Sequence, residues 1–236
     1  MSLFQRNIGP LTNFIPPRRR PMSRRPQIVL VHGFGTTPRS LTPMVDHFEG
    51  EGLACSVPSV GGVGGLWQTN RVARAGARLA EYLRGLPPGV TPWVIGHSIG
   101  GIIARTAVQL NGVASRIRGL ITLGSPHEGT PVAVAGFLMG FGLLSRAPLD
   151  ISPISGLLRE LNRAPWPSAL PLLSVVSHSD LLCPIRSGTP RFGPTSAVRT
   201  IALSSVGHTE MVRIPWVLNA LLALMNDPDA VIHPIG

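Results

Sequence analysis

The stretch GHSIGG, residues 96–101, places a serine between glycines where an apolar run gives way to a helical pattern. Residues 93–95 predict a short buried strand, and from Ile99 onward apolar residues recur at helical spacing. We therefore expect Ser98 at a sharp strand-to-helix turn, where the flanking glycines remove Cβ atoms that would crowd it. Such a turn exposes a nucleophilic hydroxyl, although a tight turn with a capping serine has the same short pattern.

A serine hydroxyl is a poor nucleophile, so a base must take its proton, and histidine suits this role because its pKa lies near neutrality. The histidines that follow Ser98 in the chain are His127, His178, His208 and His233. His208 has the best position, because it comes shortly after a predicted strand at 198–203. His127 follows another predicted strand and is a second candidate for the pocket, and a lone loop histidine can also be purely structural.

An acid must orient that histidine and stabilise its protonated form. The acids between Ser98 and His208 are Glu128, Asp150, Glu160 and Asp180. Asp180 alone follows a clear predicted strand, whereas the others fall in irregular segments or on the outer face of a helix. The chain order serine, aspartate, histidine is one of the known orders of a catalytic triad.

The elements that must position these residues alternate along the chain. The predicted strands are 28–32, 53–57, 92–96, 119–123, 172–176 and 198–203, and the predicted helices are 40–50, 68–84, 99–110 and 214–226, with a broken apolar region at 132–163. This alternation predicts an α/β fold with a mostly parallel sheet of about six strands and helices on both faces. Chemistry in such sheets lies beyond the carboxyl ends of the strands, where His32, Phe34, Ser98, Asp180 and His208 all fall.

Composition favours one large α/β domain at 27–236, preceded by an arginine- and proline-rich extension at 1–26. The net charge is +10, and the sequence has no apolar run long enough to span a bilayer. The extension does not have the form of a secretory signal, so the sequence as it stands predicts a cytoplasmic protein, with export through an upstream start left open. We interpret the extension as solvated or docked on the protein surface, with a nucleic-acid or anionic-membrane patch as the alternative. A nucleic-acid partner is not favoured, and the near absence of aromatic residues among the arginines counts against single-strand binding.

With these residues in place, the chain resembles the α/β-hydrolase superfamily, and within it the compact bacterial lipases and esterases. The resemblance rests on HGFG (32–35), GHSIGG (96–101), LGSPHEGTP (123–131), SGLLRELN (155–162), SHSDLLCP (177–184) and GHTEM (207–211). It implies a triad of Ser98, Asp180 and His208 and an oxyanion hole formed by the backbone N–H groups of Phe34 and Ile99. Some relatives hold a structural calcium, but its aspartates have no counterpart here, so neither metal nor cofactor is expected.

The resemblance also bears on the cysteines. If the strands are ordered as in the family, Cys55 and Cys183 belong to strands about four positions apart, or near 19 Å at about 4.8 Å a step, which is beyond the reach of a disulfide.

An apolar segment, VAVAGFLMGFGLL at 132–144, lies in an expected lid or pocket insertion at about 130–165. We interpret it as a flap that offers Phe137, Met139 and Phe141 to an acyl chain, with His32 also lining the pocket. The alternative is a short buried helix whose glycines allow close backbone contacts.

The reaction expected from these residues is hydrolysis of a small-molecule or lipid ester through an acyl-serine intermediate, with transient contact to a lipid interface. A thioesterase, an amidase or an acyltransferase would use the same triad, because the fold does not fix the acyl acceptor. A non-catalytic binding protein on the same fold is a further alternative, which an intact triad disfavours. The sequence does not indicate an oligomeric state.

Overall fold

The computed structural model describes residues 27–62, 69–133, 145–191 and 197–232. Within them a parallel sheet has the strand order β2-β1-β3-β4-β5-β6. Its strands are β1 (Ile28–Val31), β2 (Cys55–Ser56), β3 (Trp93–His97), β4 (Gly119–Leu123), β5 (Leu172–Ser177) and β6 (Val198–Leu203). All six predicted strands are confirmed, although β2 pairs over only two residues.

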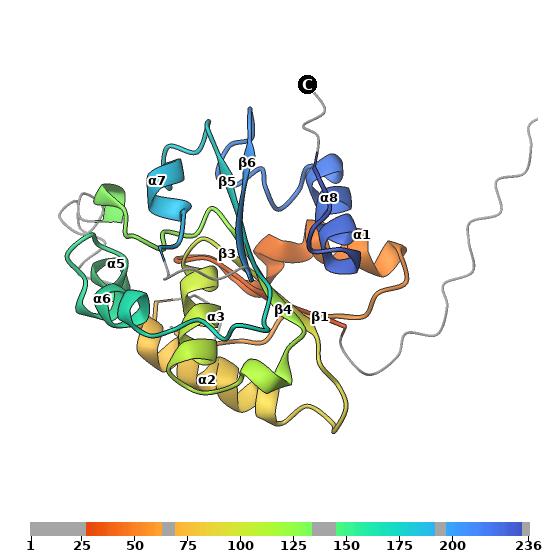
Figure 1. Cartoon of the computed structure of the whole chain (residues 1–236), viewed down its shortest axis with the longest axis horizontal. Coiled ribbons are helices and arrows are strands. Elements are labelled where there is room, and N and C mark those ends of the chain that lie inside the picture. The colour runs from red at the N-terminus through yellow and green to blue at the C-terminus, as the bar shows by residue number, and fades with distance from the viewer. Residues whose placement is uncertain (1–26, 63–68, 134–144, 192–196, 233–236) are drawn as a thin grey trace, which may run out of the picture.

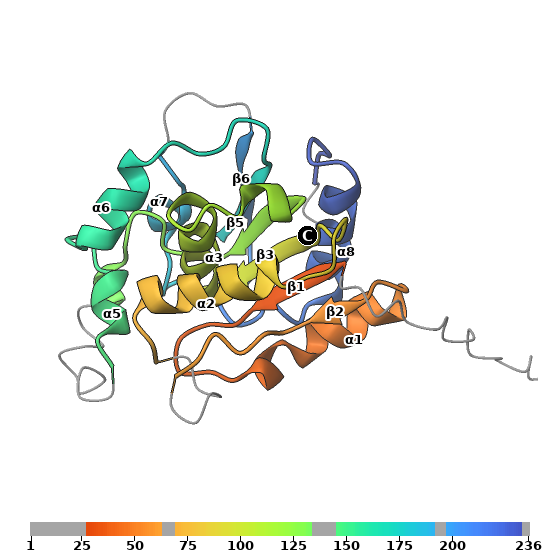
Figure 2. The same cartoon turned by 90° about the horizontal axis from the view of Figure 1, so that it is seen from below.

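Helices cover both faces of this sheet, as Figures 1 and 2 show. On one face lie α1 (Thr42–Gly50) and α8 (Pro215–Asn226), and on the other lie α2 (Val72–Arg84), α3 (Ile99–Gln109) and α6 (Gly156–Arg163). Shorter helices are α5 (Ala147–Asp150), α7 (Ile185–Gly188) and the 3-10 turns Pro38–Leu41 and Ala114–Arg116. The sequence did not predict α7 or the two 3-10 turns, which are too short to show a helical periodicity.

The core consists of two apolar layers separated by the sheet. Along β1, Val29 and Val31 pack with α2 and α3, while Ile28 and Leu30 pack with α1 and α8. Successive side chains of a strand point to opposite faces, so a strand covered on both sides must be apolar throughout. This is why the inner strands β1, β3, β4 and β5 are mostly apolar and buried throughout, whereas the edge strands β2 and β6 are partly exposed.

One face of α2 is buried, at Val72, Ala75, Leu79 and Leu83. Gly76 lies on the same face, where a Cβ would come within 2.7 Å of the Thr106 side chain on α3. The two helices therefore pack closely and hold α3, the helix behind Ser98, against the sheet.

Cys55 and Cys183 are free, with Cys55 on β2 and Cys183 in the loop after β5. The sheet order separates these strands by four positions, which confirms the expected separation. No helix in the described ranges combines the length and apolar character needed to cross a membrane.

Asp150, one of the acids considered for the triad, has a structural position instead. Its carboxylate accepts a hydrogen bond from the N–H of Val72 at 2.8 Å and pairs with the Arg71 guanidinium at 2.6 Å. It thus caps the start of α2 from the end of α5, 78 residues further along the chain. The buried carboxylate joins the two helices that flank the carboxyl edge of the sheet.

We predict that Asp150→Ala lowers the free energy of unfolding by about 1–3 kcal/mol, because it leaves a helix N-terminus uncapped and a buried N–H without an acceptor. Urea unfolding followed by circular dichroism measures this loss. Glu160→Ala, at an exposed position on α6, is the control and should change stability by less than about 0.5 kcal/mol. Equal stability of the two variants would contradict the capping role.

Candidate active site

Ser98 occupies the turn between β3 and α3, as the sequence predicts. It is the residue before the first turn of α3, and among the described non-glycine residues it alone has a positive φ, 56° with ψ −129°. This conformation is strained for a residue with a Cβ and is typical of a nucleophile held on a sharp strand-to-helix turn. Ser98 is half-buried and lines a pocket at the carboxyl edge of the sheet.

The glycines around Ser98 are required by contact distances. A Cβ on Gly100 would lie 2.2 Å from the carbonyl oxygen of Val31, and a Cβ on Gly96 would lie 2.5 Å from the backbone of Gly101. The first turn of α3 therefore approaches the end of β1 and the end of β3 more closely than any side chain permits. This close approach explains why the serine is surrounded by glycines.

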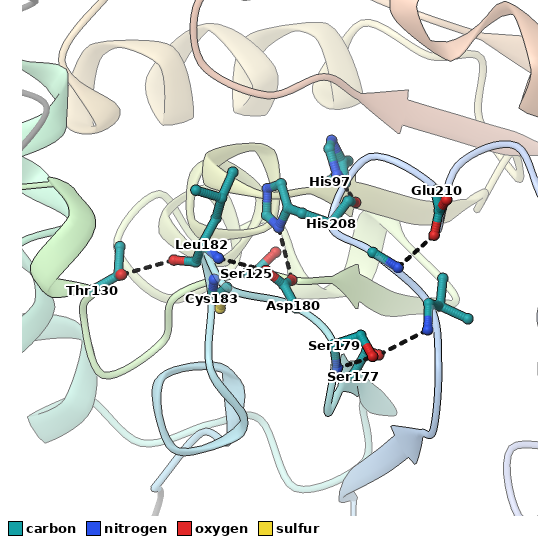
Figure 3. Close-up of polar contacts among 12 residues, drawn as sticks. His97, Ser125, Thr130, Ser177, Ser179, Asp180, Leu182, Cys183, His208 and Glu210 are labelled. Atoms are coloured by element: carbon teal, nitrogen blue, oxygen red, sulfur yellow. Dashed lines mark hydrogen bonds and ion pairs between the residues drawn. The ribbon is translucent and has the colours of Figure 1, made fainter.

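Asp180 and His208 lie together past the ends of β5 and β6 (Figure 3). His208 Nδ1 is 2.7 Å from Asp180 Oδ2, and the Asp180 side chain is fully buried. The other carboxylate oxygen, Oδ1, accepts hydrogen bonds from the N–H groups of Leu182 and Cys183 at 2.9 and 2.8 Å. Because the carboxylate only accepts, Nδ1 carries the proton, and in the neutral ring Nε2 is left free to act as a base.

His97, the residue before the serine, holds the His208 loop from the other side. His97 Nε2 lies 3.0 Å from the backbone oxygen of His208, and the two imidazole rings are 4.9 Å apart. A carbonyl only accepts, so Nε2 of His97 carries a proton. Burial, and then the nearby His208, lower the pKa of His97 to about 4, so the ring is neutral at pH 7. The sequence pattern alone did not predict a role for His97, although its position directly before Ser98 was a signal for one.

Gly124 lies beneath the Asp180–His208 pair and was also missed as an individual site residue. It has a φ of +54°, and a Cβ there would come within 2.7 Å of Asp180 Oδ2 and 3.0 Å of His208 Nδ1. A side chain at this position would therefore collide with the hydrogen bond that orients His208. The signal for it was its place in LGSPHEGTP, the stretch at 123–131.

The pocket that contains Ser98 and His208 has a volume of about 480 Å³. Phe34, Pro148, Ile151 and Leu182 give much of its wall an apolar surface, and Gly33 and Thr36 add the loop after β1. No hydrogen bond joins the Ser98 hydroxyl to His208 within the described chain, and such contacts are often loose until substrate binds. A more open hollow of about 840 Å³ lies at the opposite edge of the sheet, and no candidate site residue lines it.

The remaining predicted site residues are placed as follows. Phe34 lines the pocket, and Ile99 is the first residue of α3, where an N–H has no acceptor within its own helix. His32 is buried, with Nδ1 3.2 Å from the Thr36 hydroxyl, and is not among the residues that line the pocket. Phe137, Met139 and Phe141 lie outside the described residues.

His127, the second histidine considered for the pocket, is instead fully buried in a polar chain. Its Nδ1 lies 3.3 Å from Nη1 of the buried Arg105, and its Nε2 lies 2.9 Å from the Thr122 hydroxyl. Thr122 donates onward to Ser174, and Ser174 to the carbonyl of Gly188. That direction makes Nε2 of His127 the donor and leaves Nδ1 to accept from Arg105. The pKa of His127 is lowered by burial and by the Arg105 charge.

None of the described residues forms a cluster of three or more histidine, cysteine or acidic side chains that could hold a metal ion. The pocket brings together Ser98 and His208, and the His208 imidazole is bonded to Asp180.

Comparison with known proteins identifies the fold. The family described as PGAP1-like alpha/beta domain matches residues 78–144. The mature lipase BlEst2 of Bacillus licheniformis has 14% identity and a TM-score of 0.70, with 89% of this chain and 95% of that chain covered. A monoacylglycerol lipase of Paleococcus ferrophilus has 17% identity and a TM-score of 0.56, with 86% and 94% covered.

BpoC of Mycobacterium tuberculosis, named as a non-heme bromoperoxidase, has 15% identity and a TM-score of 0.63, with 89% of this chain and 95% of that chain covered. A sequence comparison with curated proteins finds no match. The protein has the α/β-hydrolase fold, which confirms the resemblance seen in the sequence. At these identities the neighbours define the fold, and the chemistry must be argued from the site itself.

We predict that Gly124→Ala lowers kcat for the ester hydrolysis expected from the sequence by about tenfold or more, because the new methyl group displaces the Asp180–His208 pair. Steady-state kinetics on a soluble ester measures this change. Gly112→Ala is a matched control: Gly112 has a φ of +66°, yet a Cβ there meets nothing within 4 Å. Both variants place an alanine at a positive φ, but only Gly124→Ala adds the overlap with Asp180 and His208, so only Gly124→Ala should lose activity. Equal activities would contradict the steric role of Gly124.

The buried histidines predict a loss of stability in acid. The unfolded chain binds protons near the ordinary pKa of 6.5, whereas folded His97 resists protonation down to about 4. Between these values the unfolded state holds more protons, so the free energy of unfolding falls as the pH decreases.

We predict that His97→Gln lowers the slope of this dependence by up to about 1.4 kcal/mol per pH unit near pH 5. Urea unfolding at a series of pH values measures it. His178→Gln, at an exposed position, is the matched control for a histidine-to-glutamine change. An unaltered slope in His97→Gln would show that His97 titrates normally in the folded protein.

Proposed function

We propose that the protein is a serine carboxylic-ester hydrolase that works through an acyl-serine intermediate. The observation that carries this proposal is the shared pocket of Ser98 and His208. Ser98 is held there at a φ of 56°, and His208 is bonded to the buried Asp180 at 2.7 Å. A capping serine in an ordinary turn needs neither the strained backbone nor an oriented base nearby.

In the proposed reaction, Ser98 Oγ attacks the ester carbonyl while His208 Nε2 takes the hydroxyl proton. The tetrahedral intermediate then expels the alcohol, which receives that proton from His208. A water molecule, deprotonated by the same nitrogen, then attacks the acyl-serine. The bond between the acyl carbon and Ser98 Oγ breaks, His208 returns the proton to Oγ, and the carboxylic acid leaves. Asp180 keeps the ring in the tautomer with Nδ1 protonated and stabilises the imidazolium that forms in both halves of the reaction.

The oxyanion of each intermediate would be held by the backbone N–H groups of Phe34 and Ile99. Ile99 begins α3, so its N–H and the positive end of the helix dipole both favour negative charge beside Ser98. Phe34 follows Gly33, which packs against the serine turn: a Cβ on Gly33 would lie 3.3 Å from Ser98 Cβ. The loop after β1 is thereby brought to the same side of the pocket.

The pocket favours an aliphatic acyl group. Phe34, Val132, Pro148, Ile151 and Leu182 offer apolar surface, and each substrate methylene buried against them contributes up to about 0.8 kcal/mol to binding. The structural neighbours named as lipases agree with this class of substrate.

The test is covalent labelling of the active-site serine. We expect a fluorophosphonate probe to modify the wild-type protein and mass spectrometry to place the adduct on Ser98. Ser98→Ala should lose the label and lower ester hydrolysis by roughly 10³-fold or more while the fold is retained. Asp180→Asn should still be labelled, but the labelling rate should fall by about 100-fold or more. The nucleophile remains, whereas the base loses its orientation.

Circular dichroism of both variants controls for unfolding. A label on another residue, or substantial hydrolysis by Ser98→Ala, would refute the assignment. If Glu128→Gln slowed labelling as much as Asp180→Asn, the acid would be misassigned.

A further inference from the structure

Large apolar side chains that are exposed to solvent gather around the mouth of the active-site pocket. In the described residues, Val132 is 40% exposed, Ile154 81%, Leu181 83% and Leu182 45%. Val132 and Leu182 line the pocket itself, and Leu181 precedes Leu182 in the chain. A further exposed apolar residue, Val231, lies after α8. We call the first four residues the apolar rim.

Contacts between three loops bring the apolar rim together. The Thr130 hydroxyl donates to the carbonyl of Leu182 at 2.8 Å, a bond drawn in Figure 3, and the Thr130 N–H donates to the carbonyl of Ile151 at 2.9 Å. A Cβ on Gly129 would lie 2.7 Å from the backbone nitrogen of Pro153, next to Ile154. The three segments therefore form one continuous border of the pocket, and burying their side chains would remove substantial apolar surface from water.

Positive charge surrounds this border. The segments that line or flank the pocket are 33–40, 126–133, 145–155, 178–191 and 207–213. Their exposed arginines are Arg39, Arg146, Arg186, Arg191 and Arg213. Most acidic side chains of these segments are shielded from solvent. Asp150 and Asp180 are buried and hydrogen-bonded, and Glu128 is half-buried, whereas Glu210 is exposed.

The opposite edge of the sheet has a different balance of charge. Glu51, Asp227 and Asp229 are exposed there, at the ends of α1 and α8. They accompany the exposed Arg84 and Arg118. Outside the segments around the pocket, the described residues include seven exposed arginines and six exposed acids, against five and one within those segments. The excess of exposed arginine over exposed acid is therefore concentrated around the pocket.

We propose that the apolar rim and the arginines around it dock the protein on an anionic lipid surface, with the mouth of the pocket facing the lipid. The inference rests on the proposed ester hydrolysis and names where that chemistry takes place. Apolar side chains enter the interface while guanidinium groups interact with anionic headgroups, which is the chemistry of a surface-bound protein. A second copy of the chain fits this face poorly, because two arginine-rich borders would repel each other.

The docking also explains the position of the rim. An acyl chain could pass from the lipid into the apolar pocket, between Val132 and Leu182, without crossing water. The reacting carbonyl would then arrive at Ser98 with its acyl chain already in an apolar environment. Long-range attraction by the arginines would weaken as salt is added, because a Debye length of about 8 Å at physiological ionic strength screens exposed charges.

The test is co-sedimentation with lipid vesicles, made either of phosphatidylcholine alone or with added phosphatidylglycerol. The wild-type protein should bind the phosphatidylglycerol vesicles at least about tenfold more tightly than the neutral ones, and less tightly as salt is raised. The double variant Ile154→Asp, Leu181→Asp should lose this binding by about tenfold or more. Neither residue lines the pocket, so hydrolysis of a short, water-soluble ester should be unchanged.

Matched controls test whether a charge change elsewhere on the surface also weakens vesicle binding. Val231→Asp adds a charge at an apolar position that is 72% exposed and remote from the pocket, and it should bind vesicles as the wild type does. Arg146→Glu with Arg186→Glu should weaken binding to anionic vesicles, whereas the matched double variant Arg84→Glu with Arg118→Glu at the opposite edge should have a smaller effect.

The inference would be overturned if the wild-type protein did not bind vesicles while still hydrolysing the soluble ester, or if the rim double variant bound normally. Equal binding to neutral and anionic vesicles would remove the role of the arginines. Concentration-dependent dimers in light scattering that the rim variant abolishes would assign the face to self-association instead. Failure of Ser98 labelling would refute the proposed function separately, since vesicle binding is measured without catalysis.

Discussion

The close approach of the first turn of α3 to the sheet is the constraint on which the rest of the site depends. Gly96 and Gly100 sit where any Cβ would overlap backbone atoms of Gly101 and Val31. Because the chain must turn from strand to helix in so little space, Ser98 takes a positive φ that no other described non-glycine residue adopts. The strain holds the hydroxyl at the edge of the sheet, and the start of the helix provides N–H groups beside it.

Packing behind the turn keeps this geometry in place. α3 lies against α2 through the Gly76–Thr106 contact and is tied to α6, because the buried Arg105 donates to Asn162 at 2.8 Å. Burial lowers the pKa of Arg105 to about 9, which still leaves it charged at neutral pH. A buried guanidinium is costly unless its donors are satisfied, so the polar chain through His127 accompanies it. The helix that carries the serine turn is therefore held from the side away from the pocket.

The Asp180–His208 pair depends on the same principle of satisfied burial. Asp180 has no contact with water, and its carboxylate is stabilised by two backbone N–H groups and by His208. His97 stays neutral and donates to the carbonyl of His208, so the loop after β6 is fixed to the strand that bears Ser98. Because Gly124 has no side chain, Asp180 and His208 can occupy the space next to it. The end of β3 and the loops after β4, β5 and β6 thus fix one imidazole ring.

The sequence by itself determined the alternation of strands and helices, the turn at Ser98, and the place of Asp180 and His208 beyond the ends of their strands. These features are local: apolar periodicity reports which side of an element is buried, and glycine spacing reports a tight turn. The tertiary structure alone decided the roles of Asp150, His127, His97 and Gly124. Asp150 caps a helix 78 residues away, and His97 bonds to a carbonyl 111 residues away. Such contacts depend on how the elements pack and on which rotamers the side chains adopt. A local pattern of residue types does not specify contacts between residues so far apart in the sequence.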